Sequence, residues 1–202
     1  MKKNTRGFTL VEVLVAMGVF ILIGGSIVTL LSYSFRSRNI IWEQLTTQNE
    51  GRKTVQDFIN ELRTAAQSSI GAYAIEAAAT SSIVFYSNID QDSWRERVRY
   101  FLASTTLKKG ITKPSGNPLA YRTSTESITD IVHDIAAGTT SIFYYYGDDY
   151  DGVNNSSTLA YPIDVTMVRV VGIRLYMEED PHLSPAPFIV ESKVEIRNLK
   201  IN

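Results

Sequence analysis

The sequence predicts an α+β fold, in which one long N-terminal helix precedes a domain of antiparallel strands. Three observations support this expectation. Residues 13–35 contain no charged residue and no histidine. Apolar residues then recur at helical spacing as far as residue 67. Later segments are rich in β-branched and aromatic residues, several of them in alternation with polar ones. We therefore expect a helix first and a sheet second.

The uncharged run at residues 13–35 is long enough to cross a membrane as a helix. About 20 apolar residues span a hydrocarbon core of about 30 Å. A secretory signal peptide has a shorter apolar region of about 7–15 residues, so this run exceeds it. Lys2, Lys3 and Arg6 favour a cytoplasmic N-terminus. Basic residues also follow the run, at Arg36 and Arg38, so charge alone gives only a weak orientation.

The helical pattern continues past the membrane-length run, and we expect one helix over residues 8–67. Its second half should bury one stripe and expose a charged face. Gly51 is expected to be a weak point, because glycine lowers helix propensity. The predicted stripe consists of Ile41, Leu45, Val55, Phe58, Ile59, Leu62, Ala65 and Ala66.

The remainder of the chain should form strands joined by polar loops. The expected strands are residues 81–87, 95–103, 140–147, 167–177 and 187–198. Residues 125–138 are expected to form a short helix, because Ile128, Ile131, Val132 and Ile135 are three or four positions apart. Loops are expected at residues 112–118, 147–157 and 178–187, which are rich in Gly, Pro, Asp and Asn.

The N-terminus carries a motif of known type. The stretch "RGFTLVEVLV" at residues 6–15, with its basic leader, resembles the N-termini of type IV pilins and type II secretion pseudopilins. This resemblance implies a pilin-like fold and three parts: a cleaved leader at residues 1–7, the transmembrane half of the helix at residues 8–35, and an extracytoplasmic domain at residues 36–202. It also implies that a prepilin peptidase cleaves after Gly7 and that the new N-terminal Phe8 is methylated.

Glu12 lies at the edge of the apolar run, where a carboxylate is unusual. At the centre of a bilayer a carboxylate costs roughly 2.5–3.5 kcal/mol. The resemblance implies a role in assembly, in which Glu12 of one subunit pairs with the N-terminal amine of a neighbour. The alternative is a glutamate that merely reaches toward the membrane surface.

The resemblance also suggests a function. The ending "VESKVEIRNLKIN" is similar to the J-type minor pseudopilins. We therefore expect a non-enzymatic minor pilin or pseudopilin that initiates or caps a filament at the inner membrane, with its N-terminus in the cytoplasm. Its implied partners are the peptidase, other pilins or pseudopilins, the assembly platform and membrane lipid. A tip adhesin or a DNA-uptake pilin is the alternative, and a membrane-anchored enzyme is a remote one.

Little else in the sequence indicates chemistry. There is no cysteine, which excludes disulfides and thiol catalysis. Basic residues form no cluster of the kind that binds nucleic acid. An acidic segment contains Asp149, Asp151 and Asn154, whose oxygens could bind calcium. The same residue types also form ordinary turns, so no cofactor is expected apart from this possible calcium ion.

Overall fold

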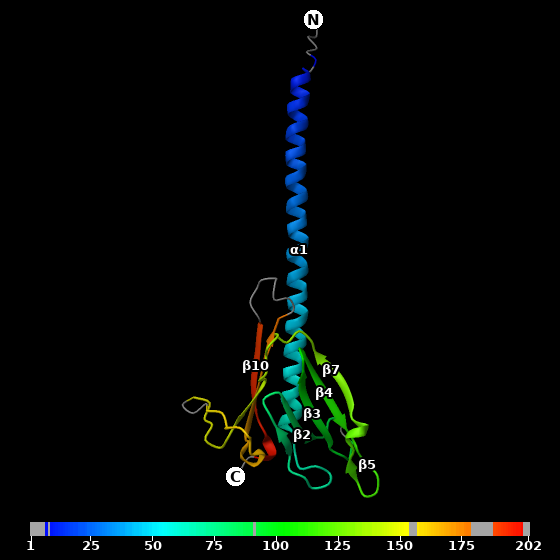
Figure 1. Cartoon of the computed structure of the whole chain (residues 1–202), viewed down its shortest axis with the longest axis vertical. Coiled ribbons are helices and arrows are strands. Elements are labelled where there is room, and N and C mark those ends of the chain that lie inside the picture. Colours follow the sequence, from blue (N-terminus) through cyan, green and yellow to red (C-terminus); the bar gives the residue numbers. More distant parts are fainter. Residues whose placement is uncertain (1–6, 8, 91, 154–156, 179–187, 200–202) are drawn as a thin grey trace. The chain divides into compact units, whose positions relative to one another are not determined.

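In the computed structural model, a long helix is followed by antiparallel sheets (Figure 1). The structure describes residues 7, 9–90, 92–153, 157–178 and 188–199, with only the backbone of residues 36, 37, 39–41, 43 and 44. The chain divides into two compact units, Met1–Glu43 and Gln44–Asn202. The predicted α+β class and pilin-like architecture are confirmed.

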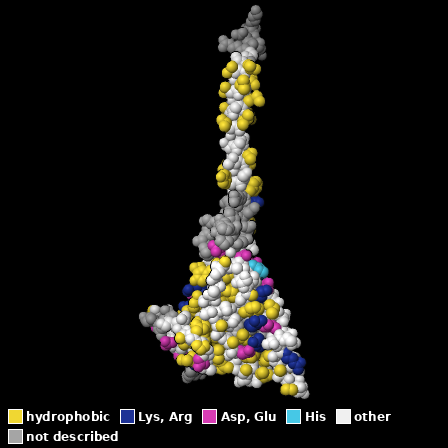
Figure 2. Space-filling view, viewed as in Figure 1, with side chains coloured by type: hydrophobic (Ala, Val, Ile, Leu, Met, Phe, Trp, Pro, Cys, Tyr) yellow, Lys and Arg dark blue, Asp and Glu magenta, His cyan; other side chains and the backbone are white. Residues whose placement is uncertain are grey.

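Helix α1 spans Leu10–Arg63 and contributes to both units. The predicted helix is thus confirmed, although it ends four residues earlier than expected. Its segment Leu10–Phe35 is long and apolar enough to cross a membrane by length and composition. The side chains of this segment are exposed, and Figure 2 shows hydrophobic groups along it.

Ser26, Thr29 and Ser32 interrupt this apolar segment, and each of the three satisfies its own donor within the helix. Ser26 donates to the carbonyl of Leu22, and Ser32 donates to that of Val28, both at 2.8 Å. The Thr29 hydroxyl makes the same bond to the carbonyl four residues earlier. Such bonds remove the need for an external partner in an apolar medium.

The second unit contains three sheets, all antiparallel. The largest has the order β1-β2-β3-β4-β7, the next has the order β10-β9-β8, and β5 pairs with β6. The strands are β1 (Ile75–Ala78), β2 (Ser82–Ser87), β3 (Glu96–Ala103), β4 (Thr106–Thr112), β5 (Pro114–Ser115), β6 (Ala120–Tyr121), β7 (Ser127–Val132), β8 (Phe143–Tyr146), β9 (Val170–Met177) and β10 (Phe188–Glu195). Short 3₁₀ turns lie at Thr123–Thr125, Val165–Met167 and Arg197–Leu199.

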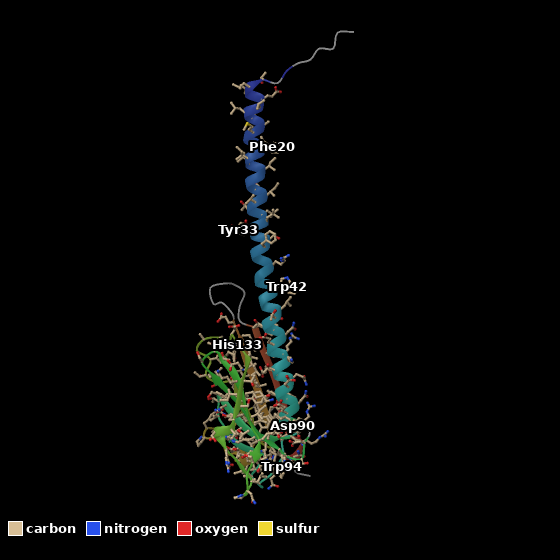
Figure 3. The ribbon with its side chains drawn as sticks, turned by 90° about the vertical axis from the view of Figure 1, so that its right-hand side faces the viewer. Phe20, Tyr33, Trp42, Asp90, Trp94 and His133 are labelled. Carbon is tan, nitrogen blue, oxygen red and sulfur yellow. The ribbon has the colours of Figure 1, made fainter. Side chains whose placement is uncertain are left out.

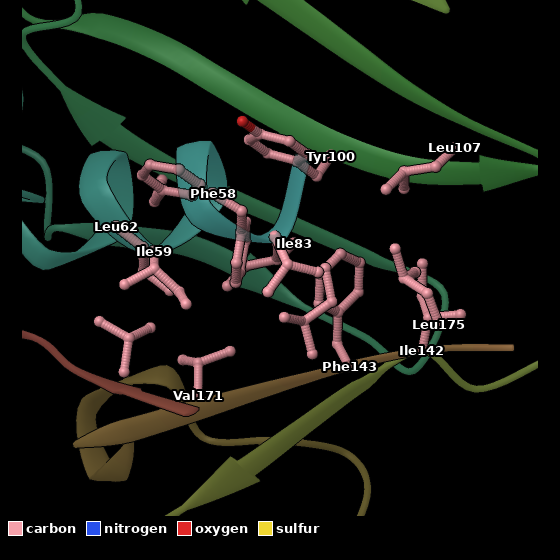
Figure 4. Packing of buried hydrophobic residues seen from close by; sticks show 14 of the residues in the cluster. Phe58, Ile59, Leu62, Ile83, Tyr100, Leu107, Ile142, Phe143, Val171 and Leu175 are labelled. Carbon is pink, nitrogen blue, oxygen red and sulfur yellow. The ribbon is translucent and has the colours of Figure 1, made fainter. Parts of the chain in front are cut away.

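Phe58 of α1 lies at the centre of the core, where the helix meets both larger sheets (Figure 4). Its ring is 5.1 Å from that of Tyr100 on β3 and 5.5 Å from that of Phe143 on β8, between centroids. Phe85 on β2 completes the cluster at 6.3 Å. The 3.6-residue period of the helix explains this packing, because Val55, Phe58, Ile59 and Leu62 share one buried face.

The expected helix at residues 125–138 is wrong. Residues 127–132 form strand β7, which pairs with β4 at the margin of the five-stranded sheet. Ile128 is 51% exposed there, so the apolar residues at helical spacing do not share a buried face. The β-branched residues of this segment suit an extended backbone, and pairing with β4 overrides the spacing signal.

Strands β2, β3, β8, β9 and β10 fall within the five segments predicted as strands. Four others, β1, β4, β5 and β6, were not expected, and β5 lies inside a predicted loop at residues 112–118. In β10 the predicted alternation is confirmed, because Val190 and Val194 are buried and the intervening Glu191 and Lys193 are exposed.

Two details of the predicted helix stripe need correction. Leu45 is 47% exposed, so the buried stripe begins farther along α1, while the side chain of Ile41 lies outside the described ones. Gly51 is a close-packing position and not a weak point. A Cβ atom there would lie 3.2 Å from Cγ2 of Val190 and 3.7 Å from Met177, so the missing side chain allows β9 and β10 to approach the helix.

Candidate functional site

The first turn of α1 is the candidate functional site, and Thr9 and Glu12 define how it begins. The backbone N–H of Glu12 donates to Thr9 Oγ1 at 3.2 Å. In return, the N–H and the hydroxyl of Thr9 donate to Glu12 Oε2 at 3.3 and 3.4 Å. This reciprocal pair is a capping box of the T-x-x-E type, which satisfies donors that a helix start leaves open.

The capping box gives Glu12 a structural role that the sequence reading missed, although the spacing T-x-x-E could have revealed it. Its negative charge in the first turn also suits the positive end of the helix dipole. Among the described residues, both contacts use Oε2, which leaves Oε1 able to meet a further partner. Capping and pairing with a neighbour are therefore compatible.

The other predicted N-terminal residues are placed as follows. Gly7 is exposed and lies outside the helix, which begins at Leu10. No described atom lies within 4 Å of the position that a Cβ at Gly7 would take. Phe8, the expected methylation site, lies outside the described residues.

The acidic segment after β8 is arranged as a turn. Asp151 accepts a hydrogen bond from the backbone N–H of Val153 at 2.8 Å, which is typical of an Asx turn. Asp148 pairs with Arg169 at 2.7 Å. Asp149 and Asp151 are exposed, and Asn154 lies outside the described residues. The calcium site expected here stays a prediction.

The outward face of the five-stranded sheet carries a chain of ion pairs. Arg97 on β3 binds Glu76 on β1 through Nε at 2.7 Å and lies 3.8 Å from Glu126. Arg99 binds Glu126 at 2.5 Å. Burial alone would raise the pKa of Glu76, but hydrogen bonds from Arg97 and from Tyr86 outweigh it and leave that pKa below its ordinary value. These pairs connect β3 to β1 and to the segment before β7, across the intervening strands β2 and β4.

Comparison with known families bears on the N-terminal segment. Residues 2–28 match the family model described as the prokaryotic N-terminal methylation motif. No curated protein matches the chain. The matched stretch includes Gly7, the capping box and most of the apolar segment, so the chain begins with a prepilin-type cleavage and methylation motif.

Proposed function

We propose that this chain is a minor pilin or pseudopilin, a structural subunit that helps to initiate or cap a type IV pilus or a type II secretion pseudopilus. The observation that carries the proposal is the methylation motif at residues 2–28, which overlaps the 26-residue apolar segment of α1. A long N-terminal helix followed by antiparallel sheets is the architecture that such a subunit requires.

In this proposal the chain is made as a precursor. A prepilin peptidase cleaves between Gly7 and Phe8 and the same enzyme system methylates Phe8, so the leader at residues 1–7 is lost. The peptidase needs access to backbone outside a helix, and the exposed, non-helical Gly7 is consistent with this. Thr9 and Glu12 both follow the cut, so cleavage leaves the capping box with all its atoms.

The helix segment at residues 8–35 then anchors the subunit in the inner membrane, with residues 36–202 outside the cytoplasm. During assembly, Glu12 pairs with the N-terminal amine of a neighbouring subunit in a medium of low dielectric constant, where leaving either charge alone is costly. The assembly platform and other pilins or pseudopilins are the partners, and the J-type minor pseudopilins are the subgroup we favour.

The processing step tests the proposal. The full chain is co-expressed with a prepilin peptidase, and the N-terminus of the membrane-inserted product is determined by mass spectrometry. We expect a mature chain that begins at methylated Phe8. An intact precursor, or a cut far downstream of Phe8, would contradict the proposal.

A matched pair of variants sharpens this test. Gly7→Val places a branched side chain at the cleavage position and should block the cut while membrane insertion continues. Gly18→Val makes the same change inside the apolar segment, and a Cβ at either glycine meets no described atom within 4 Å. Gly18→Val should therefore be cleaved normally. Equal processing of both variants would show that cleavage does not depend on Gly7.

A further inference from the structure

The loop between β2 and β3 gathers three carboxylates. Oxygen atoms of Asp90, Asp92 and Glu96 all lie within 4.8 Å of one another. Figure 3 labels Asp90 and Trp94 in this loop. Asp90 and Asp92 are exposed, whereas Glu96 is the first residue of β3 and is fully buried. The loop closes over the buried glutamate through Ile89, whose backbone N–H donates to Glu96 Oε2 at 3.1 Å.

The second oxygen of Glu96 is not satisfied by the described part of the chain. Glu96 Oε1 is buried and has no hydrogen-bond partner among the described residues. Burial raises the pKa of this carboxyl, and the nearby Asp90 raises it further. Buried carboxylates are ordinarily paired, protonated or bound to a metal. A fully buried carboxylate that clusters with two aspartates and retains an unpartnered oxygen therefore points to a ligand.

Lys113 already approaches the two aspartates from the segment that follows β4. Its Nζ atom contacts Asp90 Oδ2 and lies 3.2 Å from Asp92 Oδ2. Its side chain is 56% exposed, and both of these contacts are to the aspartates. Three carboxylates and one ammonium give a formal charge of −3 + 1 = −2 at this place, which a single divalent cation would neutralise.

We propose that Asp90, Asp92 and Glu96 form a divalent-cation site of the calcium type. The ligand chemistry is all oxygen, which Ca²⁺ prefers. Oxygens that bind Ca²⁺ at about 2.4 Å lie at most about 4.8 Å apart, so the cluster accommodates this ion with little rearrangement. Oxygens around Mg²⁺, at about 2.1 Å, must lie within about 4.2 Å of one another.

The competing interpretation is a plain ion pair, in which Lys113 is the cation of the cluster and the loop needs no metal. The two interpretations give opposite predictions for Lys113→Gln. If Lys113 competes with the metal for the aspartates, its removal tightens binding. If Lys113 is the sole cation that the loop accepts, its removal creates no metal affinity.

The experiment uses the full chain in detergent micelles, in a Trp42→Phe background that leaves Trp94 as the one tryptophan of the sequence. The Trp94 backbone N–H donates to Asp92 Oδ1 at 2.6 Å, so this residue is adjacent to the cluster and its indole can sensitise a lanthanide bound there. Tb³⁺ luminescence excited through Trp94 should rise to saturation. Addition of Ca²⁺ should then reverse the signal by displacement.

Four variants decide the outcome. Glu96→Gln and Asp92→Asn should each weaken Ca²⁺ binding by roughly tenfold or more, because affinity follows the ligand charge. Lys113→Gln should strengthen it. Asp130→Asn is the matched control: it removes an exposed carboxylate that pairs with Lys108 elsewhere on the sheet, and it should leave the affinity unchanged.

Several results would overturn the proposal. The first is the absence of a saturable Tb³⁺ signal. The second is a Ca²⁺ affinity that Asp92→Asn and Glu96→Gln leave unchanged. The third is a Ca²⁺ affinity that falls in Asp149→Asn and Asp151→Asn instead. Unchanged or weaker Ca²⁺ binding by Lys113→Gln would refute the competition between Lys113 and the metal for the two aspartates. The inference does not rest on the proposed function, since the cluster belongs to the second compact unit and prepilin processing is measured at residues 7–8.

Discussion

Replacing Glu12 by Gln separates the two roles that the first turn of α1 allows this carboxylate. Glutamine is accepted at the fourth position of a capping box, so Glu12→Gln keeps a side-chain acceptor for Thr9 while it removes the charge. Thr9→Ala is the complementary variant, which disrupts the capping box instead of the charge. It removes the Oγ1 atom that accepts the Glu12 N–H at 3.2 Å, and it keeps the charge.

The two roles differ in expected magnitude. If Glu12 pairs with a neighbour's N-terminal amine, its neutralisation leaves that amine unpaired in low dielectric, at a cost of about 3–5 kcal/mol. At about 1.4 kcal/mol for each tenfold change, this lowers incorporation by more than roughly a hundredfold. Exposure of the turn to water would reduce the effect. Loss of the cap in Thr9→Ala costs about 0.5–2 kcal/mol, and that cost falls on the helix start of a single subunit.

The assay is site-specific cross-linking of the full chain to neighbouring subunits of its own assembly system, with each variant at the same level in the membrane. Glu12→Gln should insert and be cleaved after Gly7, but its cross-linked fraction should collapse, while Thr9→Ala should stay close to the wild type. Wild-type cross-linking by Glu12→Gln would refute the pairing role. A greater loss in Thr9→Ala than in Glu12→Gln would identify capping as the role that matters.

Two further predictions concern the second compact unit, and both can be measured on the full chain in detergent, in the Trp42→Phe background, by urea unfolding followed through Trp94. Phe58→Ala should lower the free energy of unfolding by about 3–5 kcal/mol, because it leaves a cavity where three other rings meet. Phe58→Leu should lower it clearly less, and equal losses in the two variants would contradict the central place of the ring. Glu76→Gln should destabilise the protein at pH 7, because the pKa of Glu76 is lowered in the folded state and its stabilisation is present above the ordinary value of 4.5. The difference in stability from the wild type should shrink as the pH falls below that value, and the same difference at pH 3 would refute the linkage.

The sequence was a good guide where one physical signal dominated. Residues of β10 alternate between buried and exposed because one face packs on the core, so a period of two was visible. The apolar segment of α1 and the stripe around Phe58 were equally plain. Strand β4 carried no such signal, because Lys108, Lys109 and a glycine interrupt it. Those lysines bind Asp130 and Glu61, partners that only the folded chain brings near.

Other features could not be predicted from local sequence patterns, because they also depend on contacts that only the folded chain forms. Strand β7 lies at the margin of its sheet and exposes its first four residues, so its sequence lacks the alternation of a half-buried strand and its apolar residues happen to fall at helical spacing. Glu96 stands between two arginines in the sequence, which gave no hint that it is buried. By contrast, the T-x-x-E spacing of Thr9 and Glu12 is a local pattern that predicts the capping box from the sequence alone.

The internal hydrogen bonds of Ser26, Thr29 and Ser32 bear on whether a newly made subunit associates with others in the membrane before assembly. Each hydroxyl is bound to a carbonyl of its own helix, so none exposes an unsatisfied donor to lipid. These three hydroxyls thus give a subunit anchored through this helix no reason to associate prematurely within the bilayer. Single copies of the proposed subunit could then persist in the membrane. Their entry into a filament would depend on the charge of Glu12 at the start of α1.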